Sequence, residues 1–403
     1  MVDIMSARAI TVLGATGSVG SSTLDLVARG GERFTVDTLT AHRDAEGLAR
    51  LVRLHRARHA VIADESCLGE LKALLAGTGT SVAAGPQALC EAAERPVDLL
   101  MAAIVGVAGL APTLAAIRTQ RIVALANKET LVCAGALMMG EARRCGTALI
   151  SVDSEHSALA QALGGPAFLA NPDFSDVEEL IITASGGPFR ALPTPDLKRV
   201  TREQALAHPV WSMGAKISID SATLMNKALE LVEARHLFAV SPEQLKVLVH
   251  PQSIVHGLVR YRDGSVVAQM AQPDMRIPIS QALAWPGRIE TPAARLDLAA
   301  LGQLTFEAPD EARFPALRLA RDMLAGDGGA AAIVNAANEY AVSEFLAGRI
   351  AFPDIVDTCI ATLDAMGEAG VAAPSSLEEA LEIDAQARRI AAARATVLCR
   401  RSA

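Results

Sequence analysis

Three acidic side chains carry the chemistry that this sequence offers most clearly. Asp153 and Glu155 are separated by one residue and follow the apolar run 148–152, which we expect to be a strand. Glu230 lies much further along, in an amphipathic segment of helical spacing. Three carboxylates, together with water and substrate oxygens, suit a hard divalent cation such as Mg²⁺ or Mn²⁺. We therefore predict one metal ion held by Asp153, Glu155 and Glu230.

The segment that carries Glu230 also offers groups for a phosphate. Asn226 and Lys227 precede Glu230 by four and three residues, so the three side chains can share one helix face. Ser221 and Thr223 add hydroxyls just before them, and a Lys and an Asn beside hydroxyls can bind phosphate oxygens. Taken alone, the acidic pair is also typical of a helix cap, and the Lys–Glu spacing of an ordinary surface helix.

Two loops add further candidates. The stretch TASGGPF at 183–189 places a hydroxyl and two glycines after an expected strand, which suits phosphate contact. The stretch HPVWSMG at 208–214 contains Trp211, and we interpret it as a lid over the substrate. A loop anchored by a buried Trp fits the same residues. His156 is either a softer metal ligand or a histidine at a helix start.

A glycine-rich loop near the start of the chain indicates a nucleotide site. The run GATGSVG at 14–20 has the spacing G-x-x-G-x-x-G, directly after an apolar strand and at the opening of a helix. Glycines let the backbone approach a pyrophosphate, and the helix N-terminus supplies N–H groups. Thr16 and Ser18 can add hydroxyl donors. We predict dinucleotide binding here.

The end of the second expected strand bears on which dinucleotide is bound. The residues there are His42, Arg43 and Asp44. Arg43 can pair with a 2′-phosphate, which favours NADPH. Asp44 is either an acceptor for the ribose hydroxyl or an ion-pair partner of Arg43, and His42 either stacks on the adenine or is an exposed loop residue.

The pattern of elements predicts an α/β protein. Apolar runs at 9–13, 34–40, 60–63, 99–104 and 121–126 alternate with helical segments, which indicates a doubly wound, Rossmann-like sheet over residues 1–150. Residues 151–285 read as a second α/β segment that carries the metal and substrate groups, with strands at 180–183, 245–250, 253–261 and 265–270. We interpret 286–312 as a linker and 313–403 as a helical bundle, with Ser375 and Glu378 as a capping box.

Composition excludes several classes of partner. The chain of 403 residues has a net charge of −8 and only 3% aromatic residues, which argues against nucleic-acid binding. The uncharged stretch 99–117 is interrupted by Gly106, Gly109 and Pro112, so we expect a strand, a turn and a helix rather than a membrane span. Six cysteines without paired spacing, and a start that does not read as a secretion signal, lead us to expect reduced thiols and a cytoplasmic protein.

Seven motifs together resemble one enzyme family. GATGSVG, ALANKETLV, SVDSEHSAL, ASGGPF, HPVWSMGAKISIDSATLMNKALELVEA, HPQSIVHG and QPDMRIPI are similar, in this order, to motifs of 1-deoxy-D-xylulose 5-phosphate reductoisomerase. The resemblance spans nearly the whole chain, and the run through MNKALE is the most specific part of it. It implies a homodimer that isomerises a phosphorylated keto-sugar on a divalent metal and reduces it with NADPH to 2-C-methyl-D-erythritol 4-phosphate, in non-mevalonate isoprenoid synthesis.

The resemblance also implies a role for individual residues. Lys128, Asp153, Glu155 and Glu230 would be catalytic, the last three as metal ligands. The implied substrate contacts are Lys128, Ser154, Glu155, Ser185, His208, Ser221, Asn226, Lys227 and Glu230. The implied NADPH contacts are Thr16, Gly17, Ser18, Val19, Asn127, Glu129 and Gly214, with His42, Arg43 and Asp44 near the adenosine. Many members have Gly-Lys-Asn at these last three positions, and Arg43 keeps the positive charge.

Two alternatives predict different behaviour. A semialdehyde dehydrogenase on a similar layout would need a nucleophilic cysteine, whereas Cys133 lies in an apolar run and reads as core. A non-catalytic NADPH-binding sensor would need no metal-binding acids. Loss of activity on chelation, with no sensitivity to thiol alkylation, would separate the reductoisomerase from the dehydrogenase. Tight Mn²⁺ binding in the presence of NADPH would count against the sensor.

Overall fold

The computed structural model describes residues 7–165, 173–326, 328–367 and 370–402, and these divide into two compact units. The first contains Met1–Thr130, Met138–Ser157 and Asp274–Ala293, and the second Leu131–Leu137, Ala158–Pro273 and Ala294–Ala403, each within the described ranges. The predicted division into segments 1–150, 151–285, 286–312 and 313–403 stays a prediction.

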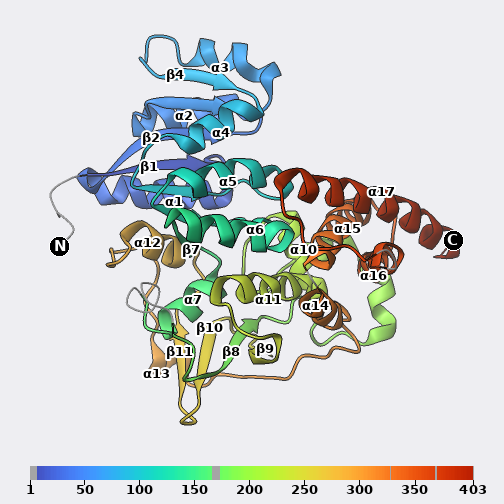
Figure 1. Ribbon diagram of the computed structural model, residues 1–403. Helices are drawn as coiled ribbons and strands as arrows, with labels where there is room; N and C mark the ends of the chain where they lie inside the picture. The colour runs from blue at the N-terminus through green and yellow to red at the C-terminus, as the bar shows by residue number, and fades with distance from the viewer. Residues whose placement is uncertain (1–6, 166–172, 327, 368–369, 403) are drawn as a thin grey trace. The chain divides into compact units, whose positions relative to one another are not determined.

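A seven-stranded parallel sheet forms the centre of the first unit (Figure 1). Its strands lie in the order β4-β3-β2-β1-β5-β6-β7, and every neighbouring pair is parallel. This is the order of a doubly wound fold, so the predicted Rossmann-like class is confirmed. The strands are β1 (Arg8–Leu13), β2 (Phe34–Ala41), β3 (His59–Ile62), β4 (Ser81–Ala84), β5 (Leu99–Ala102), β6 (Ile122–Leu125) and β7 (Ala148–Ser151).

Helices cover the faces of this sheet because its strands are apolar on both sides. The helices α1 (Ser18–Gly30), α2 (Ala45–His55), α3 (Leu68–Leu74) and α12 (Arg276–Ala284) contribute to one core with the strands. The helix α4 (Pro86–Glu94) packs against Val61, and α5 (Leu110–Thr119) lies beside α4. The uncharged stretch 99–117 forms β5, a turn and α5, and no helix in the described part of the chain is long and apolar enough to cross a membrane.

Two elements of the first unit escaped prediction. β4 is a four-residue edge strand whose sequence, SVAA, lacks a long apolar run. α12 lies far along the sequence, yet Ile279 and Leu283 are buried in the core of the sheet. The guanidinium of Arg8 donates to the carbonyls of Leu283 and Trp285 at 2.7 and 2.8 Å, which holds the end of α12 beside β1.

The second unit contains a four-stranded mixed sheet in the order β11-β10-β8-β9. The strands are β8 (Val177–Ala184), β9 (Leu245–Val249), β10 (Val255–Tyr261) and β11 (Val266–Met270). β8 and β9 are parallel, and the other pairs are antiparallel. A hairpin turn at Asp263 and Gly264 joins β10 to β11, where Gly264 has a φ of 87°.

Helices that carry candidate residues pack on this sheet. They are α7 (Ser154–Ala162), which runs across the division between the units, α10 (Ala215–Thr223) and α11 (Met225–Phe238). The helical bundle expected near the C-terminus is present as α14 (Ala316–Ala325), α15 (Gly329–Leu346), α16 (Asp354–Gly367) and α17 (Leu377–Ser402) (Figure 1). Within the expected linker, only the short α13 (Leu298–Leu301) is helical. Glu307 of this segment forms an isolated antiparallel β-bridge with Val249.

The capping box predicted from Ser375 and Glu378 is shifted by one residue. The backbone N–H of Glu379 donates to the Ser376 hydroxyl at 3.2 Å, and the Glu379 carboxylate accepts from the backbone N–H of Ser375 at 2.7 Å. Two serines in succession offer the same local pattern in two registers, so the sequence could not distinguish them.

Candidate active site

The glycine loop after β1 has the geometry of a nucleotide site. Gly14 has a φ of +79°, and a Cβ there would lie 2.6 Å from the carbonyl oxygen of Ala103, so only glycine fits between the ends of β1 and β5. β1 and β5 flank the point where the strand order reverses, which is where doubly wound sheets bind ligands. Gly17 begins α1 without a side-chain cap, which leaves the N-terminal end of that helix for a ligand to cap.

In the loop after β2, the charged residues Arg43 and Asp44 each have a different partner. His42, Arg43 and Asp44 are all exposed. Arg43 Nε lies 2.5 Å from Asp64 Oδ2, and the Asp44 carboxylate accepts from the backbone N–H of Gly47 at 2.8 Å as the N-cap of α2. Of the two roles left open for Asp44, the ion pair with Arg43 is therefore not formed, and the role of ribose acceptor stays a prediction. Hydrogen bonds from Ser66 and Arg43 lower the pKa of the Asp64 carboxyl to about 2.

The segment after β6 contacts both the loop after β5 and one of the predicted acids. Asn127 is only 2% exposed, and its amide donates to the carbonyls of Ile104 and Gly106 while accepting from the N–H of Thr130 at 3.1 Å. It thereby fixes the loop after β5 to the start of α6 (Glu129–Cys145). Lys128 Nζ lies 2.7 Å from Asp153 Oδ2, so this predicted catalytic lysine contacts one of the predicted metal ligands.

Packing of α7 against α11 positions the acids. Leu159 and Ala162 in α7 share a core with Leu229 and Val232 in α11. Asp153 immediately precedes α7, and its carbonyl accepts from the N–H of Ser157 at 2.9 Å. Because α7 is one continuous helix, its buried second half holds its first turn, where the acids lie.

The structure brings the three predicted acids together. Asp153, Glu155 and Glu230 each offer a carboxylate oxygen, and these oxygens all lie within 4.8 Å of one another. The Glu230 side chain is 1% exposed and that of Asp153 14%. A cluster of buried carboxylates needs positive charge nearby, and Lys227 Nζ supplies some at 2.5 Å from Glu230 Oε2. The donor set fits a hard cation, and its use as a metal site stays a prediction.

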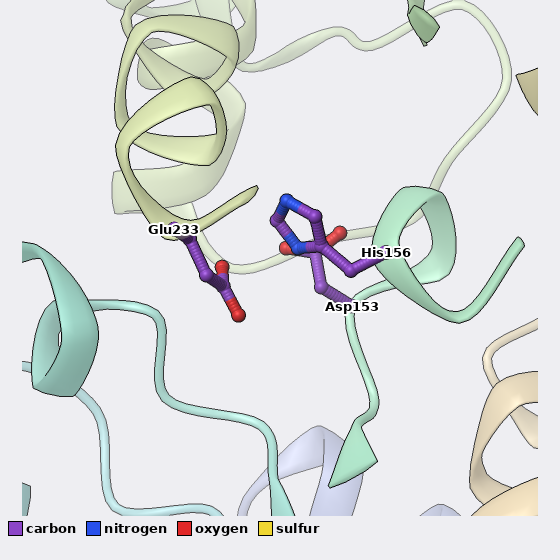
Figure 2. Close-up of side chains that lie close together, drawn as sticks. All are labelled: Asp153, His156 and Glu233. Carbon is purple, nitrogen blue, oxygen red and sulfur yellow. The ribbon is translucent and has the colours of Figure 1, made fainter. Parts of the chain in front are cut away.

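A second, overlapping group contains His156, for which a metal-ligand role was one of two predicted alternatives, and Glu233, which was not foreseen. Figure 2 shows Asp153 and His156 close to Glu233, and one potential ligand atom of each lies within 4.8 Å of the others. His156 and Glu233 are 0% and 1% exposed. His156 follows Asp153 by three residues and Glu233 follows Glu230 by three, so each lies about one helical turn beyond one of the predicted acids. That shared spacing was the signal in the sequence.

The loop after β8 meets α10 at the predicted phosphate site. The backbone N–H of Gly187 donates to Ser185 Oγ at 3.1 Å, and Ser185 Oγ lies 2.9 Å from His208 Nε2. Gly187 has a φ of +68°, and a Cβ there would lie 2.8 Å from the carbonyl oxygen of Ser221. Thr223, by contrast, is buried and its hydroxyl donates to the carbonyl of Ile219, so its predicted contribution to a phosphate site stays a prediction.

The tryptophan of the expected lid contacts a histidine that sequence reasoning missed. Trp211 and His256 pack edge to face, with ring centroids 6.0 Å apart. His256 belongs to HPQSIVHG, a motif used for the resemblance without a role for either histidine. Gly214 ends the loop as the exposed residue that begins α10.

Comparisons with known proteins agree with this architecture. Residues 10–135 match the family described as 1-deoxy-D-xylulose 5-phosphate reductoisomerase, residues 149–238 its C-terminal domain, and residues 270–390 the domain described as the DXP reductoisomerase C-terminal domain. The chain belongs to the 1-deoxy-D-xylulose 5-phosphate reductoisomerase family. Curated reductoisomerases from Afipia carboxidovorans and Bradyrhizobium sp. are 54% and 53% identical, each over 96% of this chain and over 94% and 93% of their own lengths.

Solved structures of reductoisomerases have the same fold. The enzyme from Zymomonas mobilis, in complex with NADPH, is 50% identical with a TM-score of 0.89 over 96% of this chain and 98% of its own. A reductoisomerase in complex with NADPH, fosmidomycin and magnesium is 39% identical with a TM-score of 0.93 over 97% of this chain and 99% of its own. The resemblance, the fold class and the NADPH-dependent oxidoreductase class predicted from the sequence are confirmed.

Proposed function

We propose that Asp153, Glu155 and Glu230 hold the divalent cation with which this enzyme converts 1-deoxy-D-xylulose 5-phosphate to 2-C-methyl-D-erythritol 4-phosphate. The observation that carries the assignment is the approach of the three carboxylate oxygens to within 4.8 Å of one another. Oxygen-only ligands suit Mg²⁺ and Mn²⁺ better than the alternative group containing His156. Magnesium is present in related structures, which supports this choice.

In this assignment His156 and Glu233 do not bind the ion themselves but support the residues that do. Both side chains are more deeply buried than Asp153 and lie near it. Groups in this position orient the ligands of a metal and tune their basicity. A single ion bound by Asp153, Glu155 and Glu230 therefore gives a role to the residues of both overlapping groups.

When bound, the cation supplies Lewis-acid stabilisation of the negative charge that develops on the substrate oxygens. Lys128, beside Asp153, adds positive charge or a proton at the reacting end. Ser185, Ser221, Asn226 and Lys227 bind the phosphate, so that binding energy from the far end of the substrate orients the reacting carbons. The loop containing Trp211 excludes water.

NADPH binds at the carboxyl ends of the first unit's strands. Two features support binding of the pyrophosphate there: the close approach of the Gly14 backbone to Ala103, and the start of α1, which has no side-chain cap. The Arg43 side chain is 72% exposed and pairs with Asp64 through Nε, so its remaining N–H groups can donate hydrogen bonds to a 2′-phosphate. NADPH in the related Zymomonas mobilis structure supports this assignment.

The enzyme acts as a homodimer in the cytoplasm. In the described part of the chain β11 pairs only with β10, so its other edge is open, and Val266 and Val267 of this strand are 49% and 42% exposed. An apolar open edge is a template for pairing with a second chain. Cys67, Cys90, Cys133, Cys145 and Cys359 are free thiols, as expected of a reducing compartment. A mass of 42.0 kDa by light scattering, that of one chain, would contradict the dimer.

The activity is tested by following NADPH oxidation with 1-deoxy-D-xylulose 5-phosphate as the substrate. We expect oxidation only when substrate and a divalent cation are both present, loss of activity with EDTA, and recovery with excess Mg²⁺ or Mn²⁺. Treatment with a thiol-alkylating reagent serves as the control for a cysteine-dependent dehydrogenase and should leave the rate unchanged. Undiminished oxidation in EDTA would refute the metal's role.

A further inference from the structure

A buried carboxylate outside the proposed metal and phosphate sites lies directly beside the latter. Asp220 in α10 is 1% exposed and immediately precedes Ser221. Its Oδ2 lies 2.6 Å from the Nζ of Lys216, one turn earlier in the same helix. Its Oδ1 accepts a hydrogen bond of 2.8 Å from the amide of Asn338, 118 residues away in α15. Asp220 therefore joins α10 to the C-terminal helices.

The surroundings of this carboxylate are closed. Asn338 is 0% exposed, and its Oδ1 has no hydrogen-bond partner among the residues that the structure describes. Burial raises the pKa of the Cys359 thiol in α16, and the nearby charge of Asp220 raises that pKa further. A buried amide with one unsatisfied atom is unfavourable relative to an apolar side chain. What the amide provides here is one directional bond to Asp220.

The apolar contacts of α10 do not define its position as sharply. Ile219 and Ala222 share a core with Val342 and Phe345 of α15. Such contacts are nondirectional and allow small shifts along a neighbouring helix. The Asn338 bond, by contrast, is directional and fixes α10 relative to α15 at Asp220, while the Lys216 pair within α10 holds the carboxylate in the orientation that accepts it.

The position of α10 matters because a loop touches its backbone. A Cβ on Gly187 would lie 2.8 Å from the Ser221 carbonyl oxygen and 3.0 Å from Ala222 Cα. The loop that carries Ser185 is thus in direct contact with the turn that carries Ser221. At the end of α10, Leu224 adopts a left-handed conformation with a φ of 62°, and α11, with Asn226 and Lys227, begins at the next residue.

We propose that Asp220 is the positioning residue of the phosphate site. By tying α10 to α15 through Asn338, with its own carboxylate oriented by Lys216, it sets the distance between the Ser221 hydroxyl and the groups on the neighbouring loop and on α11. The inference rests on the proposed function, since it takes Ser185, Ser221 and Lys227 as phosphate contacts. Asp220 does not touch the substrate, and it acts through Ser221.

The test compares Asp220→Asn with Asp384→Asn. Asp384 is also buried, at 6%, and its carboxylate pairs with Arg388 within α17, so its loss controls for the general effect of removing a buried acid from the second unit. For each variant we would measure the KM values for 1-deoxy-D-xylulose 5-phosphate and NADPH, kcat, competitive inhibition by inorganic phosphate, and the melting temperature.

For Asp220→Asn we expect the KM for the phosphorylated substrate and the inhibition constant of phosphate to rise together, on the order of tenfold, because small misplacements of binding groups have large effects. The KM for NADPH and kcat should change much less. Asp384→Asn should lower the melting temperature while leaving both phosphate-dependent constants near those of the unmodified protein. Phosphate-dependent constants equal to those of the unmodified protein in both Asp220→Asn and Asn338→Ala would overturn the proposal.

Two further variants keep the result interpretable. Asn338→Ala removes the donor from α15 and keeps the Lys216 pair, so it tests the same link if Asp220→Asn does not fold. Because the amide oxygen introduced by Asp220→Asn can still accept from Asn338, Asn338→Ala should raise the same two constants at least as much. Lys227→Ala probes the phosphate site itself. A large effect of Lys227→Ala with none from Asp220→Asn or Asn338→Ala would reject the positioning role alone, and no effect from any of the three would reject the phosphate site.

Discussion

The imidazole of His208 joins the Trp211 loop to the Ser185 loop. Its Nδ1 accepts from the backbone N–H of Trp211 at 2.8 Å, and its Nε2 lies 2.9 Å from Ser185 Oγ. Since Nδ1 is an acceptor, the neutral ring carries its proton on Nε2 and donates to Ser185. Burial, and then the positive charge of Lys227, lower the pKa of His208, which favours this neutral form.

This relationship predicts a pH dependence of substrate binding. The lowered pKa keeps His208 neutral at and above its usual value near 6.5, and protonation at lower pH would place a proton on Nδ1 against the Trp211 N–H. We expect the KM for substrate to rise as the pH falls below about 6.5. In His208→Asn the KM should be higher at neutral pH and depend less on pH. The phosphate of the substrate titrates in both proteins, so only the difference between the two profiles reports on His208.

Glu230→Gln should nearly abolish turnover. The substitution keeps the size of the side chain but removes one negative charge from the predicted ligand set, and altering even groups behind a metal ligand costs about 10- to 100-fold. We expect a loss of at least that size in kcat, with the affinity for NADPH unchanged when measured by fluorescence titration. Near-normal turnover would remove Glu230 from the metal site.

Lys227→Ala should act mainly on substrate affinity. A charge-assisted hydrogen bond contributes about 1.5–3 kcal/mol, which corresponds to a rise in KM of roughly 10- to 100-fold. Lys198, an exposed lysine of the same unit, provides the control, and Lys198→Ala should leave the KM unchanged. If both variants had the KM of the unmodified protein, Lys227 would not contact the phosphate.

Arg43→Ala should reduce the preference for NADPH over NADH. The loss of one charge-assisted contact predicts a decrease of about tenfold in the ratio of kcat/KM values for the two cofactors. Arg50, exposed on α2, is the matched control, and Arg50→Ala should keep the ratio. An unchanged ratio in Arg43→Ala would mean that the 2′-phosphate is recognised elsewhere.

His236 should make the protein less stable in acid. Burial, and then Arg235, lower the pKa of His236 to about 4, below its unfolded value near 6.5. The neutral ring is therefore favoured in the fold, and its contribution is complete above pH 6.5 and is lost as the pH falls toward 4, by up to about 1.4 kcal/mol per pH unit. In His236→Asn the free energy of unfolding, from urea titrations between pH 7 and 5, should fall less steeply. Parallel curves for the two proteins would contradict this assignment.

The sequence predicted elements best where local pattern and burial agree. The strands β1, β2 and β5 read as apolar runs because helices cover both faces of a parallel sheet. β4 was missed because a four-residue edge strand with alternating exposure gives little signal. α12 was not assigned because its burial depends on packing against a sheet more than 100 residues earlier, which no local period reveals.

The candidate site was predictable where its residues fall within distinctive motifs. Asp153, Glu155 and Glu230 were grouped from their chemistry and from the resemblance, and their oxygens do lie together. Glu233 and His256 were missed because single acids and histidines in apolar segments are common, and only tertiary packing shows what they face. Asp220 escaped notice for the same reason, since its partner Asn338 lies in another helix.

The most direct test of the central assignment is a crystal structure of the enzyme with Mn²⁺, NADPH and a substrate analogue, phased to show the anomalous signal of the metal. We predict one peak, bound by carboxylate oxygens of Asp153, Glu155 and Glu230. A peak bound by His156 and Glu233 instead, or no peak near these acids at a Mn²⁺ concentration that supports full activity, would contradict the account.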